Sequence, residues 1–303
     1  MDEIGEVLNI WNGKLAALFN QRLQHDDPTI REGAVYFLGE MQAEKSITAL
    51  TDMLRDEDNK VQNAAVHALS KIGQSALQSL LDILLDDQER LEVRQLSARA
   101  IGEIADARAV DPILSLLKTV DEETLMIDLV VALGKIGEKQ AVDNLVAIFN
   151  DKEASPFLIS SSAWSLGRIE DPTTVKHLLK AFHSPIDIVS MSAARALGKI
   201  RSKEATEELV HYYISTSKRF HELTSQSKKL QTLKVRALRT IKVIGLPAAK
   251  ALVNSLEANQ NDCSQSVIED ILFALKEISG QDFGNDVKGW LHWVNQRNDD
   301  LSI

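Results

Sequence analysis

Apolar residues recur along most of the chain at the spacing of amphipathic helices. Between residues 61 and 84 they form two groups, the first being Val61, Ala64, Ala65, Ala68, Leu69 and Ile72 and the second Leu77, Leu80, Leu81 and Leu84. Intervals of three and four residues place each group on one face of a helix. The stretch therefore predicts two consecutive helices, and each needs a neighbour against which it can bury that face.

The same two-helix pattern repeats along the chain. Its copies align on the small or polar residue that follows an Ala-rich run, namely Gly39, Ser70, Gly102, Gly134, Gly167, Gly198, Lys242 and Lys276, in steps of 31, 32, 32, 33, 31, 44 and 34 residues. A period of this length with two helices per unit is typical of an α-solenoid. We therefore expect an all-α fold, a right-handed superhelix of about seven to eight two-helix repeats.

The ends of a stacked array expose apolar faces that need covering. We expect one solenoid over residues 1–303, with an N-terminal capping region at 1–26, repeats at 27–280 and a C-terminal cap at 281–303. The residues expected to cover the two ends are Leu15, Leu18, Phe19 and Leu23 at the first, and Trp290 and Trp293 at the second.

The repeats resemble HEAT repeats of the phycobilisome-lyase type, which have an armadillo-type fold. Residues 91–118, LEVRQLSARAIGEIADARAVDPILSLLK, are similar to the pattern VRxxAAxALGxIGDPRAVxxLxxxLxD of that family, and the resemblance covers about residues 27–280. Repeats of this kind serve bilin lyases, protein scaffolds and many uncharacterised bacterial proteins. The resemblance also implies that the second helix of each repeat lines the concave surface of the array.

One step of the series is about 12 residues longer than the others. The step runs from Gly198 to Lys242, and the additional residues are best placed at about 214–231, ISTSKRFHELTSQSKKLQ. Insertions in repeat proteins often form loops on a binding face. The alternative is that the insertion lengthens a pair of helices.

The region around this insertion is basic, although the whole chain has a formal charge of −10. Between residues 210 and 256 there are nine Lys or Arg and one acid, so this segment carries +8 and the rest of the chain −18. We name these nine residues the basic island. Its candidates for holding an anionic partner are Lys218, Arg219, Lys228, Lys229, Arg236 and Arg239. The alternative is a solvated face that complements the acidic repeats of the chain itself.

An acidic protein surface is the favoured anionic partner. Nucleic acid is disfavoured, because few aromatic residues accompany the basic ones and the acidic remainder of the chain would repel phosphate. The exposed residues of the second helices form another candidate surface for a protein partner. The residues expected on that concave row are Gln78, Asp82, Asp111, Ser115, Asp143, Lys176 and Lys180.

Sequence signals for an enzyme are weak. Helical His-Glu pairs, which di-iron hydroxylases built on HEAT repeats need in several units, occur once, at His221 and Glu222, and the other histidines have no ligand spacing. There is no Gly-x-Ser-x-Gly motif and no Gly-rich phosphate loop. The single cysteine, Cys263, stands in a polar segment without a neighbouring cation. We expect no catalytic residue, metal or cofactor.

These observations predict a non-enzymatic scaffold or adaptor that binds another protein. The alternative is a bilin lyase or chromophore-handling chaperone, which rests on the family resemblance alone, and a nucleic-acid-binding protein ranks below both. The first residues lack the features of a secretory signal, and no apolar run reaches the length of a membrane span. A cytoplasmic protein is therefore expected.

Overall fold

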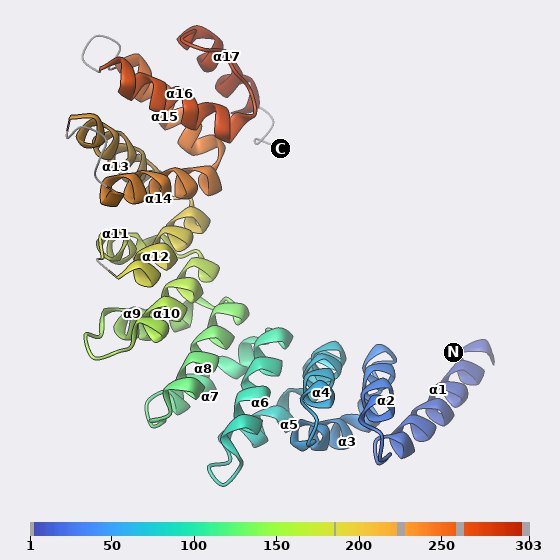
Figure 1. Ribbon diagram of the computed structural model, residues 1–303. Coiled ribbons are helices and arrows are strands. Elements are labelled where there is room, and N and C mark those ends of the chain that lie inside the picture. The colour runs from blue at the N-terminus through green and yellow to red at the C-terminus, as the bar shows by residue number, and fades with distance from the viewer. Residues whose placement is uncertain (1–2, 185, 223–227, 259–263, 299–303) are drawn as a thin grey trace. The chain divides into compact units, whose positions relative to one another are not determined.

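The computed structural model describes residues 3–184, 186–222, 228–258 and 264–298, with side chains except at residues 3–10, 228, 229 and 298. Regular structure in these ranges consists of helices and includes no strand, which confirms the all-α solenoid prediction (Figure 1). No helix there has the apolar length that crossing a bilayer requires. The chain divides into two compact units, Met1–Ile148 and Phe149–Ile303. The expectation of one continuous array stays a prediction.

Helices of the first unit alternate between the two members of each repeat. The first helices are α2 (Pro28–Glu40), α4 (Asn59–Ile72), α6 (Leu91–Ile104) and α8 (Glu123–Ile136). The second helices are α3 (Ile47–Asp52), α5 (Leu77–Leu85), α7 (Val110–Leu116) and α9 (Val142–Asn150), which contains the boundary between the units. Helix α1 (Glu3–Arg22) packs on α2.

The second unit continues the alternation. Its first helices are α10 (Pro156–Ile169), α12 (Asp187–Ile200), α14 (Lys228–Ile244) and α16 (Gln265–Ser279). Its second helices are α11 (Val175–Phe182), α13 (Lys203–Glu222) and α15 (Leu246–Ala258), and α17 (Val287–Asn298) follows as the last helix. We call the even-numbered helices the first-helix row and the odd-numbered helices from α3 to α15 the second-helix row.

Short polar side chains begin several of these helices. The Asp27 carboxylate accepts a hydrogen bond from the Thr29 N–H at 2.8 Å, and the Ser155 hydroxyl accepts one from the Leu158 N–H at 3.2 Å. In both cases proline occupies the following position, where its fixed φ suits the first turn of a helix. The Asp-Pro and Ser-Pro pairs therefore fix where α2 and α10 start.

Glycine near the end of a first helix allows the next first helix to approach closely. A Cβ added at Gly39 would lie 2.6 Å from the Ala68 Cα atom, and one added at Gly167 would lie 2.6 Å from the Ala196 Cα atom. Either contact is too short for real atoms, so a larger residue would force the helices apart. The Gly-against-Ala contact thus explains why this position recurs in the repeat.

The inserted residues lengthen two helices, α13 and α14, to 20 and 17 residues, whereas residues 223–227 between them lie outside the described residues. The long helices are fastened to α16 at Asp270. The Tyr213 hydroxyl donates to the Asp270 carbonyl at 2.9 Å, His221 Nε2 lies 2.9 Å from the Asp270 carboxylate, and Lys234 pairs with the same carboxylate. Burial, and secondly the charge of Asp270, raises the pKa of Tyr213.

Both ends of the chain carry helices against the adjoining repeat. Leu23 is buried, and Phe19 stacks on Phe37 of α2 with ring centroids 4.2 Å apart, but Leu18 is 48% exposed, contrary to expectation. At the other end Trp290 and Trp293 are both buried, and Trp290 Nε1 donates to the Gly284 carbonyl at 3.0 Å. Their role as caps stays a prediction.

Candidate functional site

The structure distributes the basic island over two rows of helices. Lys218 and Arg219 belong to α13 in the second-helix row, whereas Arg236 and Arg239 belong to α14 in the first-helix row. The side chains of Lys228 and Lys229 lie outside the described residues. Charges that are close together in the sequence therefore act on different surfaces.

Three cations of the island pair with carboxylates of this chain. The Arg236 guanidinium lies 2.6 Å from the Asp187 carboxylate and donates to the Ser190 hydroxyl at 2.6 Å. Lys242 pairs with Glu277 at 2.6 Å, and Lys234 pairs with Asp270. These three residues fit the alternative to partner binding, in which basic residues complement acidic groups of the protein itself.

The other cations with described side chains lie at the surface. Lys218 is half-buried and Arg219, Arg239 and Lys250 are exposed, and none of the four has a carboxylate partner among the described residues. Lys218 and Lys250 both line a groove between α13 and α15. This groove is the candidate site.

The groove between α13 and α15 has a volume of about 850 Å³. Its lining includes four cations, namely Arg201, Lys203, Lys218 and Lys250, and one acid, Glu207, which lies 3.8 Å from Lys203. Val210 and Ile214 also line it, and both side chains are buried. We name this the cationic groove. The cationic groove thus combines apolar residues with a net positive charge.

The positive surface continues onto the preceding second helix. Lys176 and Lys180 of α11 are both exposed, as expected from the sequence. Between them His177 is half-buried, and burial followed by the charges of these two lysines lowers its pKa. The second-helix row of the second unit therefore presents cations on α11, α13 and α15.

In the first unit the same row is acidic. All five residues expected there are exposed on second helices, namely Gln78, Asp82, Asp111, Ser115 and Asp143. Gln78 donates to Asp82 at 2.8 Å, and Gln140 donates to Asp111 at 2.5 Å. The row thus changes sign between the two units. That it forms a concave surface stays a prediction.

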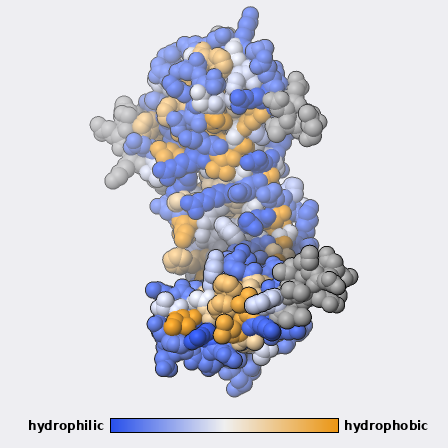
Figure 2. Space-filling model, turned by 90° about the vertical axis from the view of Figure 1, so that its right-hand side faces the viewer, coloured by the Kyte–Doolittle hydropathy of each residue, from blue (hydrophilic) through white to orange (hydrophobic). Residues whose placement is uncertain are grey.

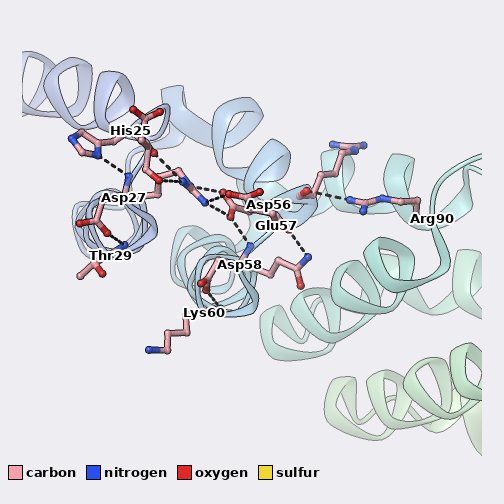
Figure 3. Close-up of polar contacts among 12 residues, drawn as sticks. His25, Asp27, Thr29, Asp56, Glu57, Asp58, Lys60 and Arg90 are labelled. Carbon is pink, nitrogen blue, oxygen red and sulfur yellow. Dashed lines mark hydrogen bonds and ion pairs between the residues drawn. The ribbon is translucent and has the colours of Figure 1, made fainter.

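A dense polar cluster in the first unit has a structural role (Figure 3). The Arg31 guanidinium donates twice to the Asp56 carboxylate at 2.8 Å and also to the carbonyls of His25 and Asp26 at 2.9 and 3.0 Å. Burial alone would raise the pKa of Asp56, but hydrogen bonds from Arg31 and from the Asp58 N–H hold it below its ordinary value. The cluster satisfies its own charges and fastens α2 to the segment before α4.

The remaining sequence candidates are the histidines, Glu222 and Cys263. Among the described residues no three His, Cys, Asp or Glu side chains gather as metal ligands. Cys263 lies outside those residues. The sequence interpretation had passed over Arg201 and Lys203, which line the cationic groove. The sequence could have indicated Lys203, since Lys203, Val210 and Lys218 fall near one face of a continuous helix.

Comparison with known proteins supports the repeat architecture. A family model for HEAT repeats matches residues 15–92 and 87–161. A relative, the uncharacterized phycocyanin operon protein Z of Pseudanabaena tenuis, is 22% identical over 190 residues, which cover 50% of this chain and 94% of that protein.

Solved structures of helical solenoids are similar to this chain. A structure of importin beta has a TM-score of 0.60 with 14% identity and covers 93% of this chain and 46% of its own. Yeast importin-beta gives 0.58 with 14% identity, covering 93% and 44%. The complex of CpcE and CpcF of phycocyanin lyase from Nostoc sp. PCC7120 gives 0.44 with 18% identity, covering 87% and 94%. The importin similarities show a fold of stacked helical repeats.

Proposed function

We propose that this chain, whose residues 15–161 match a model for HEAT repeats, is a non-enzymatic scaffold that binds an acidic segment of another protein. The observation that carries this proposal is the cationic groove between α13 and α15, where four cations and one carboxylate surround the space. A solenoid supplies such a site with a preformed shape, so little ordering is required when the partner arrives.

The charge of the groove favours an acidic partner. The chain has a net charge of −10, so the groove is a local positive region on a negative molecule. Charges arranged in this way select complementary partners and speed their encounter. The apolar side chains of Val210 and Ile214 are buried at the groove, so its charged and polar residues would make most of the contact.

Protein partners are also known for similar folds. The solenoid structures that resemble this chain include one of Kap95p that concerns its binding to RanGDP and one of a Kap95:Nup1 complex. These partners belong to those proteins. They support the coarser statement that surfaces of this architecture suit protein recognition.

Chromophore handling is the second candidate. It is supported by the similarity to a protein named for a phycocyanin operon. The two candidates predict different bound material, because a tetrapyrrole absorbs visible light and a colourless protein segment does not.

The test is a double charge reversal in the groove. Lys218→Glu with Lys250→Glu should lower affinity for the acidic partner at least about tenfold, because both interactions become repulsive. A matched control, Lys152→Glu with Lys288→Glu, reverses two exposed lysines of the same unit outside the groove. Partners are captured from nuclease-treated native lysate, identified, and remeasured in purified form with each variant.

Each outcome decides between the candidates. Loss of an acidic protein from the groove variant and its retention by the control support the scaffold. Visible absorption in the captured material favours chromophore handling. Equal binding by both variants overturns the groove as the binding site, and affinity for an oligonucleotide that falls steeply with salt would favour nucleic acid.

A further inference from the structure

A second groove lies in the first-helix row of the same unit, between α12 and α14. Its volume is about 500 Å³. Three of its lining residues are large apolar side chains at the surface, with Met191 39%, Val235 41% and Val243 46% exposed. Figure 2 shows that hydrophobic residues reach the surface among hydrophilic ones on the face it displays. We name this the apolar groove.

The groove lies where the close Gly-against-Ala contact is absent. In the preceding pair of first helices, Gly167 faces Ala196, which stands two positions before Gly198. The corresponding position in α14 is Thr240, and a Cβ added at Gly198 would meet the Val243 side chain at 3.0 Å, not an alanine Cα atom. Threonine and valine therefore stand at this contact in place of alanine, and both line the groove.

A carboxylate that joins α6 and α8 in the first unit has no counterpart between α12 and α14. On α8, Asp128 accepts hydrogen bonds from Gln95 at 2.9 Å and from Arg99 at 3.0 Å, both on α6. Asp128 stands six positions before Gly134 in its repeat. The corresponding position in α14, six before Lys242, holds Arg236.

Arg195 is therefore left without that partner. Arg195 occupies the repeat position of Arg99, and both Arg195 and Arg239 are exposed with no carboxylate partner among the described residues. Asp187 is the one acid in the lining, and it pairs with Arg236. The groove thus has an apolar floor and two arginines that an incoming carboxylate could meet.

We propose that the apolar groove binds an amphipathic α-helix of a partner protein. The apolar face of that helix packs on Met191, Val235 and Val243, and its carboxylates meet Arg195 and Arg239, as Asp128 meets Arg99 in the first unit. This is recognition by helix in groove, with anchors at intervals of three and four residues. The site is separate from the cationic groove, which is lined by other helices, so it goes beyond the proposed function.

The dimensions of the groove suit a helix of about three turns. Gln231, Val235, Arg239 and Val243 line it at steps of four residues along α14. Twelve residues of helix span about 18 Å, which is the length of slightly more than three turns. A guest helix lying along α14 would present its own side chains at the same spacing.

A synthetic peptide tests the proposal directly. The probe is a fluorescein-labelled peptide of about 16 residues with Leu at four successive anchor positions of one helical face and Glu beside them. A scrambled peptide of the same composition is the control. By fluorescence anisotropy, the wild-type protein should bind the amphipathic peptide at least about tenfold more tightly than the scrambled one. Val235→Asp should remove that preference, because it places a charge on the apolar floor.

A charge exchange tests the arginines. Arg195→Glu with Arg239→Glu should bind the Glu peptide at least about tenfold more weakly and should prefer a version carrying Lys in place of Glu. Lys199→Glu, an exposed residue of α12 outside the groove, is the control. Circular dichroism verifies that each variant is folded.

Three results would overturn the inference. They are equal binding of scrambled and amphipathic peptides, wild-type binding by Val235→Asp, and loss of peptide from the Lys218→Glu, Lys250→Glu variant. The last result would put the peptide in the cationic groove, which would refute this inference and leave the proposed function standing. Conversely, peptide binding in the apolar groove stands even if the cationic groove binds no partner.

Discussion

The two units repeat one pattern of helices but differ in how their surface charges are used. The first unit contains 14 Lys or Arg and 26 Asp or Glu, a net charge of −12, whereas the second contains 20 and 18, a net charge of +2. In the first-helix row of the first unit, Lys71 pairs with Glu40 at 3.1 Å and Lys135 with Glu103 at 2.6 Å. Neighbouring helices there complement one another.

The corresponding row of the second unit is less self-contained. Arg195 and Arg239 have no carboxylate partner in the described part of the chain, and Met191 and Val235 are exposed beside them. Two positions of the repeat distinguish α14 from α8, because Arg236 stands at the position of Asp128 and Thr240 at the position of Ala132. A repeat array can thus gain a binding surface by changing a few positions while its core pattern stays the same.

The largest expected effect is loss of the buried aromatic at the end of the second unit. Trp290→Ala should lower the free energy of unfolding by about 4 kcal/mol, because the side chain is 1% exposed and its removal leaves a cavity. Chemical denaturation measures the loss. Hydrogen exchange should rise first in α16 and α17 and leave α2 to α6 protected.

Trp11 offers a matched control in the first unit. Its side chain is exposed on α1, so Trp11→Ala should change stability by less than about 0.5 kcal/mol. Equal losses for the two variants, or exchange that rises evenly along the chain, would refute the capping role of Trp290.

The second prediction compares two arginines at structural positions. Arg31→Met in the first unit should lower Tm by roughly 5 °C or more, because it removes both hydrogen bonds from the nearly buried Asp56 carboxylate. Arg236→Met in the second unit should have a smaller effect, because its partner Asp187 is 80% exposed and remains hydrated. Differential scanning calorimetry of the two variants measures the difference.

The pH dependence of stability gives a further test of the Arg31–Asp56 pair. The pKa of Asp56 is lower in the folded chain than in the unfolded chain, so its stabilisation is complete above the unfolded pKa and is lost as the pH falls through the folded value. Arg31→Met removes a cause of that lowering and should therefore reduce the acid dependence of stability. An unchanged pH profile would show that Arg31 and Asp56 do not interact in solution.

The repeat architecture was predictable because its signals are local. The series from Gly39 to Gly198 marks the ends of first helices, and the Asp-Pro and Ser-Pro pairs mark helix starts. Each signal depends only on residues within one or two turns or one period. The insertion was expected at about 214–231, but whether it forms a loop or lengthens helices depended on whether α13 and α14 continue beyond their normal length, which the period does not determine.

The candidate site was less predictable because charge pairing is not local. Counting cations between residues 210 and 256 combined Arg236, whose partner Asp187 is 49 positions away, with Lys218, which lines a groove. Arg201 and Lys203 lie outside that window, yet both line the groove with Lys218. Lys203 and Lys218 belong to one long helix, α13, and Arg201 stands just before it. Only the register of neighbouring helices separates paired cations from available ones.

The third prediction makes the second unit resemble the first. Arg236→Asp restores an acid at the position of Asp128, so Arg195 should gain an internal partner. Affinity for the amphipathic probe peptide should then fall about tenfold, because the new internal carboxylate pairs with Arg195 in place of the carboxylate of the peptide. Arg236→Gln separates loss of the arginine from gain of the acid, and it should retain most of the binding. Equal weakening by both variants would contradict the argument from the missing carboxylate.

The smallest expected effect concerns His177, which reports the charge of the second-helix row. Burial, and then the charges of Lys176 and Lys180, keeps its pKa below the ordinary value, so the folded chain binds a proton there less readily than the unfolded chain does. Its contribution to stability is therefore present above the unfolded pKa and is lost as the pH falls through the folded value.

Lys176→Gln with Lys180→Gln should raise the pKa of His177 in an NMR titration, because two nearby positive charges are removed. The wild-type pKa should rise in the same direction when an acidic segment binds near α11. If the double substitution leaves the titration unchanged, burial alone perturbs His177, and the lysines of α11 contribute no field that could attract an acidic partner.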